Sequence, residues 1–301
     1  MKRLAFASVI LACRVLSLAA DQRERPRIYI LASVRFRVSD LQKSRAFYQK
    51  TFQIGAVRQD CFGANTLCLD INEAQRIELI QGDTSSKTNS VEQVGFRTYD
   101  LDGLRRYLIH GGAKPGAITK DKDGKRSFDV LDPEGHRAVF LSVPLPGSFA
   151  SWPGQVGGEI IHAGFVVHDR AAEDHFYKDI LGFRVYWHGG RKDDETSWVD
   201  MQVPDGTDWI EYMLNVPANA DHHTLGVMNH IALGVPDIHA AEAQLRKNGW
   251  TGNEQPKTGR DGKWQLNLYD PDDTRVELME FTPTQKPCCS EYTGPHPGQH
   301  P

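Results

Sequence analysis

One pattern, a β-strand followed by an aspartate and an amphipathic helix, occurs four times along this chain. Its aspartates are Asp40, Asp100, Asp169 and Asp237, which lie 60, 69 and 68 residues apart. An aspartate suits the start of a helix because its side chain accepts a hydrogen bond from a free backbone N–H group. Short runs rich in branched and aromatic residues follow each helix, so each repeat reads β-α-β-β-β. The repeat therefore predicts an α+β protein built from four copies of one unit.

A segment rich in proline and glycine, at 144–158, separates the four units into two pairs. We expect each pair to form one domain, over residues 27–146 and 158–283. Residues 284–301 are rich in proline and are expected to form a mobile tail.

The N-terminus has the composition of a secretory leader. Lys2 and Arg3 precede an apolar run, and a small-x-small site follows at 17–19. We interpret residues 1–26 as a signal segment, which predicts an extracytoplasmic protein, periplasmic or secreted. If the leader is not cleaved, the protein would be cytoplasmic. No later segment has the roughly 20 consecutive apolar residues that a membrane-spanning helix needs.

Charge and cysteine content exclude other classes. The net charge is −4, from 35 basic and 39 acidic residues without a long basic run, which gives no sign of a nucleic-acid surface. Five cysteines are few for a disulfide-rich scaffold. Cys61 and Cys68 flank a predicted hairpin tip, where a cross-strand disulfide and two free thiols are alternatives. Cys288 and Cys289 are adjacent in the tail, where metal binding, oxidation and simple exposure all stay open.

The third and fourth units carry histidines and glutamates at matching positions. His162 and His230 lie on the first strand of their units, and Glu211 and Glu277 lie on the last. Because side chains alternate between the faces of a strand, all four can point into one cup formed by the paired units. Two neutral imidazoles with carboxylate oxygens suit a divalent transition metal. The pattern therefore predicts a metal site held by these four residues.

The first half of the chain keeps the repeat but not this ligand set. Alignment of the repeats places Ser33 and Gln93 at the positions of the two histidines, and Glu78 and Val139 at those of the two glutamates. One carboxylate would hold such a metal weakly. We therefore expect the N-terminal half to be structural or substrate-shaping, with the metal site in the C-terminal half.

The four units, the His/Glu/His/Glu set and the DPxG-like turn before the final strand resemble the vicinal-oxygen-chelate superfamily, over residues 28–282. That superfamily includes glyoxalase I, bleomycin resistance proteins and extradiol dioxygenases. The resemblance implies two domains, each a curved, cup-shaped mixed sheet with helices outside. It also implies one divalent metal ion (Ni, Co, Zn, Fe or Mn) and a small-molecule substrate that binds this ion through neighbouring oxygens.

Two reactions of that superfamily fit parts of the sequence. Glu211 completes a four-ligand set like that of glyoxalase I, in which metal-bound glutamates move a proton, so Glu277 or Glu211 would be catalytic. Extradiol dioxygenases are similar in length, but Asn267 stands where their tyrosine would be and no histidine precedes it. The resemblance therefore favours a glyoxalase I-like lyase or isomerase over a ring-cleaving dioxygenase. A non-catalytic small-molecule-binding protein is a third alternative.

Polar and aromatic residues near the expected metal site are candidates for substrate contact. Trp198, Gln265 and Asn267 lie on the strands that precede those of the two glutamates. Further residues could line the pocket, although the tryptophans also suit core packing: Trp187, Trp209, Arg191 and Lys263. The sequence does not name the substrate, and a homo-oligomer stays open.

Overall fold

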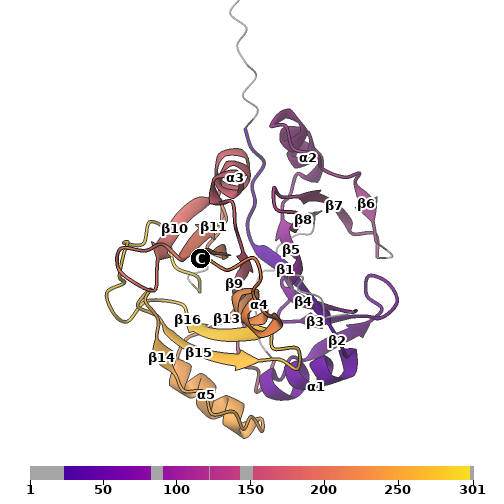
Figure 1. Ribbon diagram of the computed structural model, residues 1–301. Coiled ribbons are helices and arrows are strands. Elements are labelled where there is room, and N and C mark those ends of the chain that lie inside the picture. Colours follow the sequence, from indigo (N-terminus) through magenta and orange to yellow (C-terminus); the bar gives the residue numbers. More distant parts are fainter. Residues whose placement is uncertain (1–23, 83–90, 122, 143–151, 299–301) are drawn as a thin grey trace, which may run out of the picture.

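The computed structural model describes residues 24–82, 91–121, 123–142 and 152–298. The protein contains two eight-stranded mixed sheets, each built from two of the predicted repeats (Figure 1). Most of the predicted leader and of the 144–158 segment lies outside the described residues.

The N-terminal domain follows the predicted order of elements. They are β1 (Leu31–Val38), α1 (Leu41–Phe52), β2 (Ala56–Gln59), β3 (Thr66–Asp70), β4 (Arg76–Gln81), β5 (Val91–Arg97), α2 (Leu101–His110), β6 (Thr119–Lys120), β7 (Arg126–Leu131) and β8 (Arg137–Ser142). The strand order β2-β3-β4-β1-β5-β8-β7-β6 places the two repeats back to back, with β1 and β5 paired at the centre.

The C-terminal domain repeats this plan. Its elements are β9 (Glu159–Val166), α3 (Arg170–Glu173), η1 (Asp174–Ile180), β10 (Arg184–Gly189), β11 (Trp198–Gln202), β12 (Trp209–Met213), α4 (His222–Met228), β13 (His230–Val235), α5 (Ile238–Lys247), β14 (Lys257–Thr258), β15 (Trp264–Tyr269) and β16 (Arg275–Glu280). The strand order is β10-β11-β12-β9-β13-β16-β15-β14, so β9 and β13 form the central pair. The predicted α+β fold of two paired-repeat domains is confirmed.

Aspartate side chains start the four repeat helices, as predicted. Each accepts a hydrogen bond from a backbone N–H group in the first turn, at Asp40, Asp100, Asp169 and Asp237. The third helix differs from the expected regular α-helix, because after one turn it continues as the π-helix η1. Single π turns often lie at functional positions, and this one begins beside the buried Glu173.

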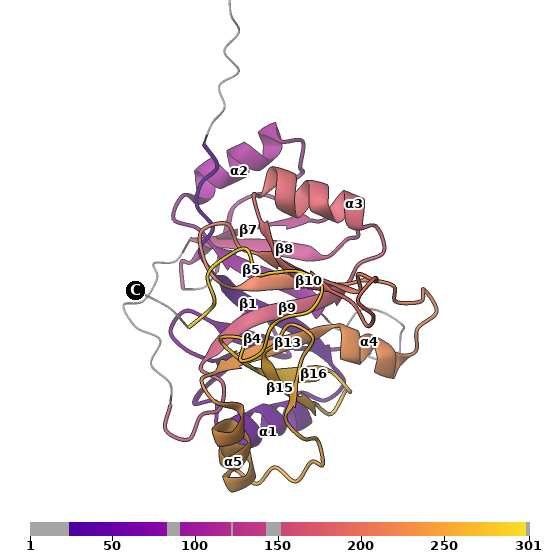
Figure 2. The same cartoon turned by 90° about the vertical axis from the view of Figure 1, so that its left-hand side faces the viewer.

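A pseudo-twofold relation links the domains. Where β1 and β9 approach each other, the Leu31 N–H group donates to Asp208 Oδ2, and the Ile160 N–H group donates to Gln75 Oε1, each over 2.9 Å. Figures 1 and 2 show the same relation for the helices, since α1 lies beside α5 and α2 beside α3. Both domains also contribute to one hydrophobic core.

The predicted mobile tail is not what the structure shows for residues 284–298. They fold back over the C-terminal sheet (Figure 2), where the Trp187 indole donates to the Cys288 carbonyl over 3.1 Å. The Tyr292 hydroxyl donates to the Asp261 carbonyl over 2.9 Å. Proline did not prevent packing, because the tail satisfies its backbone groups against β10 and the loop before β15.

The structure shows which of the alternatives for the two cysteine pairs holds. Cys61 forms a disulfide with Cys68, and Cys288 forms one with the adjacent Cys289. Within the described residues, no helix is long and apolar enough to cross a membrane.

The shared core predicts that the two domains unfold together. Five of the six tryptophans lie in the C-terminal domain, so a Trp152→Phe background makes fluorescence report that domain alone. We expect Phe128→Ala, which removes a buried ring packed on Phe140 in the N-terminal domain, to cost about 3–5 kcal/mol. The tryptophan unfolding midpoint in urea should therefore fall. An unchanged midpoint would show that the domains unfold independently.

Candidate metal centre

The two predicted histidines meet at the centre of the C-terminal sheet. His162 lies on β9 and His230 begins β13, and these strands are antiparallel neighbours. The two Nε2 atoms are 3.0 Å apart and both side chains are fully buried. Gly164 lies opposite His230 in the strand pair, and a Cβ atom there would come within about 2.0 Å of the imidazole. Glycine at this position therefore makes room for the ring.

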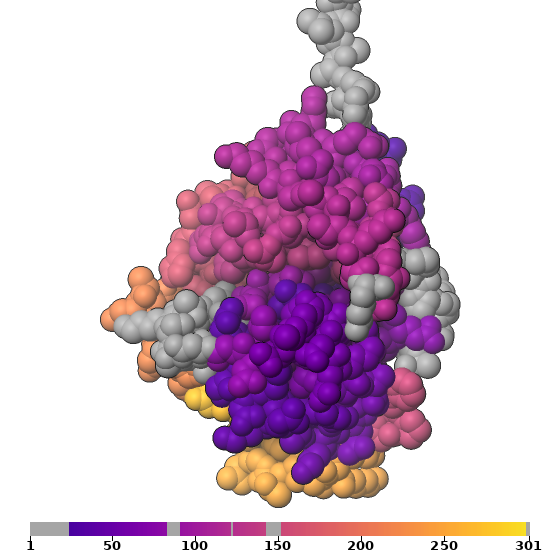
Figure 3. Space-filling view, turned by 90° about the vertical axis from the view of Figure 1, so that its right-hand side faces the viewer, coloured from indigo at the N-terminus to yellow at the C-terminus, as the bar shows by residue number. Residues whose placement is uncertain are grey.

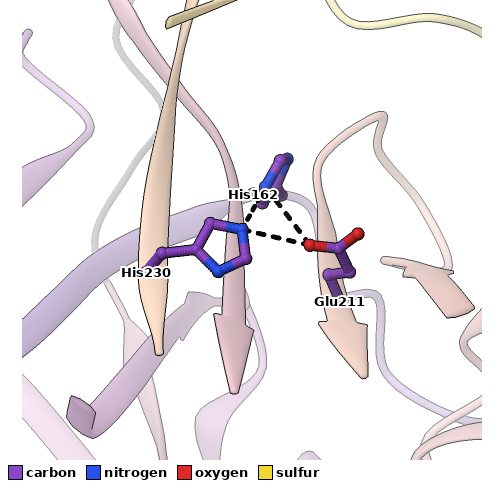
Figure 4. Close-up of side chains that lie close together, drawn as sticks. All are labelled: His162, Glu211 and His230. Atoms are coloured by element: carbon purple, nitrogen blue, oxygen red, sulfur yellow. Dashed lines mark hydrogen bonds and ion pairs between the residues drawn. The ribbon is translucent and has the colours of Figure 1, made fainter. Parts of the chain in front are cut away.

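Both predicted glutamates point to the same place from the strands on either side. Glu211 Oε2 lies 3.0 Å from His230 Nε2 and 3.8 Å from His162 Nε2. Glu277 Oε2 lies 3.7 Å from each of these nitrogens. Figure 4 shows Glu211 facing the two imidazoles. The structure therefore brings all four residues together.

The site holds its groups in forms that suit a cation. Burial lowers the pKa of both His162 and His230 well below the usual range, so the imidazoles are neutral. Burial also raises the pKa of Glu211 and of Glu277 to about 7, against a smaller opposing effect of Arg275. Because ionised carboxylates in a buried site need a compensating charge, a divalent cation would stabilise both as ligands.

The geometry fits one ion. Two atoms bonded to the same metal at about 2.1 Å lie about 3.0 Å apart at a right angle and about 3.4 Å apart in a tetrahedron. The five separations that involve a histidine nitrogen span 3.0 to 3.8 Å, and His162, Glu211 and His230 form the tightest group. His230 Nδ1 lies 2.9 Å from the Met228 carbonyl, which holds the proton on Nδ1 and makes Nε2 the acceptor that a metal would use in place of Arg275 Nη2, 2.7 Å away. His162 Nδ1 is buried without a hydrogen-bond partner among the described residues.

A second buried charge cluster borders the metal site. Lys263 is fully buried, with its Nζ atom 4.6 Å from the ring centroid of Trp209 and 5.4 Å from that of Tyr292. Burial lowers the pKa of this lysine to about 8, while Asp261 and Asp200 oppose the shift. The fold-back of the tail therefore closes the aromatic surroundings of this ammonium group.

Residues predicted to contact substrate fall on the same side of the sheet as the metal set. Asn267 lies directly opposite Glu277, and Gln265 lies two residues before it on β15. Trp198 lies two residues before Asp200, which is opposite Glu211. Asn267 Oδ1 is buried without a hydrogen-bond partner among the described residues, so it is available to a ligand. Trp187 and Trp209 pack with Met279 in the same cluster.

Sequence reasoning missed Arg275 and Asp200. The Arg275 Nη2 atom lies 2.7 Å from His230 Nε2 and 3.9 Å from Glu277 Oε2. Burial, followed by the charge of Glu211, raises the pKa of Asp200 well above its usual range. Strand alternation could have found Arg275, because it precedes Glu277 by two residues on one strand. Arg191, which the sequence offered as a pocket residue, is exposed on the loop after β10.

The N-terminal domain has arginine at the equivalent place. Arg35 holds the position in β1 that Gly164 holds in β9, opposite a glutamate on one side. Its Nη2 atom lies 2.7 Å from Glu78 Oε2, and the Arg76 Nη2 atom lies 2.6 Å from Glu78 Oε1. Two guanidinium groups thus neutralise the one carboxylate that remains of the ligand set.

Around Glu78 the sheet encloses a cavity of about 1240 Å³. Figure 3 shows the hollowed face of this domain between the indigo and magenta segments. Its lining includes six arginines: Arg35, Arg37, Arg58, Arg76, Arg97 and Arg137. Acidic residues line the same cavity, and several form ion pairs with these arginines. This cavity belongs to the N-terminal domain, and the four histidines and glutamates of the candidate metal site do not line it.

The C-terminal half is similar to one known family. Residues 159–278 match the family model of the Glyoxalase/Bleomycin resistance protein/Dioxygenase superfamily. A comparison with curated proteins gives no match.

Similar solved structures are those of homoprotocatechuate 2,3-dioxygenase from Brevibacterium fuscum. A histidine-to-asparagine variant in complex with HPCA has a TM-score of 0.64 and 21% identity, over 92% of this chain and 75% of that one. The anaerobic complex with 3,4-dihydroxyphenylacetate has a TM-score of 0.60 and 21% identity, over 92% and 85%. A tyrosine-to-phenylalanine variant has a TM-score of 0.63 and 21% identity, over 89% and 74%. At this identity the likeness shows the fold.

Glu211 and Glu78 form a matched pair for testing the site, since they hold equivalent positions in the two domains. We expect Glu211→Gln to weaken metal binding more than about tenfold, at least as much as the loss of an outer-shell partner does. Glu78→Gln should leave the metal content unchanged. Metal analysis after dialysis measures both. Metal loss in Glu78→Gln would show that the N-terminal domain supplies a ligand, which would contradict the predicted site.

Metal affinity should depend on pH. Because the pKa of Glu211 and of Glu277 is raised to about 7, a metal must displace protons from these carboxyls below that pH. The imidazoles stay neutral over the same range, because burial lowers their pKa. We expect Zn²⁺ affinity to fall from about pH 8 to about pH 6, by up to about tenfold per pH unit for each proton displaced. Titration against a chelating dye tests this, and a constant affinity would contradict it.

Proposed function

We propose that this chain, whose residues 159–278 are a domain of the glyoxalase/bleomycin resistance protein/dioxygenase superfamily, is a metal-dependent enzyme acting on a small molecule with two neighbouring oxygens. The observation that carries the proposal is the convergence of two neutral imidazoles and two carboxylates at the centre of the sheet. His162, Glu211, His230 and Glu277 would hold the ion.

The bound ion would act as a Lewis acid that polarises a substrate oxygen. Glu211 and Glu277 would supply the proton transfer, because a carboxylate held beside the bound ion can act as a general base. The side chain of Glu211 is 13% exposed and that of Glu277 is 3% exposed. Glu211 is therefore the better placed of the two to exchange a proton with a substrate.

A lyase or isomerase of the glyoxalase I type fits these residues best. Glu211 Oε2 lies as close to His230 Nε2 as the two histidine nitrogens lie to each other, which supports its inclusion in the proposed ligand set. The position opposite Glu277 holds Asn267, which has neither a phenol nor an imidazole to move a proton. Asn267, Gln265 and Trp198 would contact the substrate, with the amide groups fixing its orientation.

An extradiol-type ring-cleaving dioxygenase is the second candidate. One observation favours it, namely that the solved dioxygenase structures share the two-domain fold over most of this chain. A facial set of two histidines and one carboxylate is complete in His162, His230 and Glu277, so Glu211 would then be dispensable as a ligand.

An extracytoplasmic location agrees with the disulfides. Cys61–Cys68 and Cys288–Cys289 are both oxidised, and disulfides persist in secreted and periplasmic compartments but are rare in the cytosol. Glutathione is scarce outside the cytosol, so we propose a substrate other than a glutathione adduct.

Glu211 decides between the two reactions. With a panel of α-hydroxycarbonyl compounds in D₂O, the metal-loaded protein should exchange the carbon-bound hydrogen. Glu211→Gln should slow this exchange about 10²–10⁴-fold, the usual contribution of a general acid or base. Glu78→Gln serves as the control and should retain the exchange rate.

Oxygen consumption provides the opposing test. The iron-loaded protein should consume no oxygen with a panel of catechols. Uptake of oxygen that persists in Glu211→Gln would overturn the lyase or isomerase in favour of the dioxygenase.

A further inference from the structure

Two equivalent contacts fasten the first helix of each domain to a turn of the other domain. Tyr177 of η1 donates its hydroxyl proton to Asp132 Oδ2 over 3.2 Å. Tyr48 of α1 donates to Asp270 Oδ2 over 3.4 Å. Asp132 and Asp270 occupy the same place in the two similar turns, at 131–137 and 269–275. The Asp–Tyr contact is thus common to both sides of the domain interface.

The two contacts differ at two other positions. Four residues before the tyrosine, α1 has Ser44 whereas the third helix has Glu173. Four residues after the aspartate, the turn of the fourth repeat has Thr274 whereas the turn of the second has His136. Only one of the equivalent contacts therefore carries a carboxylate and an imidazole beside the shared aspartate.

These two groups meet the aspartate in a buried space. His136 Nδ1 lies 2.8 Å from Asp132 Oδ2. Ligand-type atoms of Asp132, His136 and Glu173 all lie within 4.8 Å of one another. Their side chains come from both domains, so anything bound among them joins the domains. Atoms bonded to one Zn²⁺ ion lie about 3.0–3.4 Å apart, so these side chains would have to move slightly toward one another to bind a shared cation.

Glu173 has an open acceptor at this place. One of its oxygens, Oε1, accepts from the Glu134 N–H group over 3.1 Å. The other, Oε2, has no hydrogen-bond partner among the described residues, although Glu173 is fully buried. Buried polar atoms are normally satisfied, so this oxygen needs either a proton shared with the Asp132 carboxyl or a bound cation.

Tyr212, which lies near this cluster, also lacks a hydrogen-bond partner in the part of the chain that the structure describes. The hydroxyl group of Tyr212 on β12 is buried and has no hydrogen-bond partner among the described residues. Burial raises its pKa, and the carboxylates that add most to this shift are Glu173, Asp174 and Asp132. Burial and the charge of Asp132 also raise the pKa of Glu173 to about 9. The cluster thus holds excess negative charge that either a proton or a cation must neutralise.

We propose that Asp132, His136 and Glu173 form a second divalent-cation site, which clamps helix α3 of the C-terminal domain to the N-terminal domain. One imidazole with two carboxylates is a donor set that suits Zn²⁺. The ion is structural, because it lies under the helix and among aromatic rings that include Phe165, which packs on His136 with ring centroids 4.4 Å apart. This site is independent of the proposed reaction.

Zinc titration of the full-length protein tests the proposal. After removal of metals with a chelator, the protein should take up two Zn²⁺ ions per chain, measured by mass spectrometry of the native protein. His136→Asn and Glu173→Gln should each take up one. Glutamine has the shape of a protonated glutamate, so Glu173→Gln should keep the packing of the folded protein and remove only the negative charge. His230→Ala should also take up one ion, and His136→Asn combined with His230→Ala should take up none.

The equivalent contact provides the matched control. Thr274→Val and Ser44→Ala should leave two ions per chain. If His136→Asn and Glu173→Gln still bind two ions, the interface site does not exist. If the wild type binds one ion and His230→Ala binds none, the interface cluster holds a proton instead and the proposal fails, while the first metal site stands. If the wild type binds one ion that His136→Asn and Glu173→Gln remove and His230→Ala does not, the first site is wrong and the second stands.

Discussion

The pairing of β9 with β13 is the constraint on which the site depends. Antiparallel neighbours at the centre of a sheet bring residues of two distant repeats within side-chain reach. Here the pairing sets the two imidazoles 3.0 Å apart, and the parallel partners β12 and β16 add one carboxylate from each side. No loop contributes a ligand. The four donors are therefore as rigid as the hydrogen-bonded ladder, which is what a preorganised metal site requires.

The N-terminal domain shows what the same scaffold does without a metal. Its sheet has the same order, and Glu78 occupies the position of Glu211, but Arg35 pairs with this glutamate from the strand position at which Gly164 makes room for the His230 ring in the other domain. A buried carboxylate needs a partner charge, and a guanidinium group satisfies that need as well as an ion does. Arg35 in place of Gly164, together with the loss of both histidines and of one glutamate, thus separates an ion-paired cup from a chelating one. The cavity that remains above Glu78 is then free for other uses.

Much of this could be predicted from the sequence, because the repeat appears in it directly. The capping aspartates fixed the helix starts, and strand alternation placed His162, Glu211, His230 and Glu277 on one face. The packing of the tail and the Cys288–Cys289 disulfide had no periodic signal to reveal them. The cluster around Glu173 was also beyond reach, since its members come from different repeats and meet only through the pseudo-twofold docking of the domains. The π turn escaped prediction because π- and α-helices share similar side-chain patterns over one turn.

The central claim is that one ion binds among four strand residues of the C-terminal domain and that the N-terminal domain replaces it by arginine. Anomalous diffraction from crystals grown with Zn²⁺ tests this most directly. The account predicts a peak about 2.1 Å from the nearest atoms of His162, Glu211, His230 and Glu277, and no peak beside Glu78. A peak beside Glu78, or a C-terminal site in which Arg275 fills the space between the histidines and no metal binds, would contradict it.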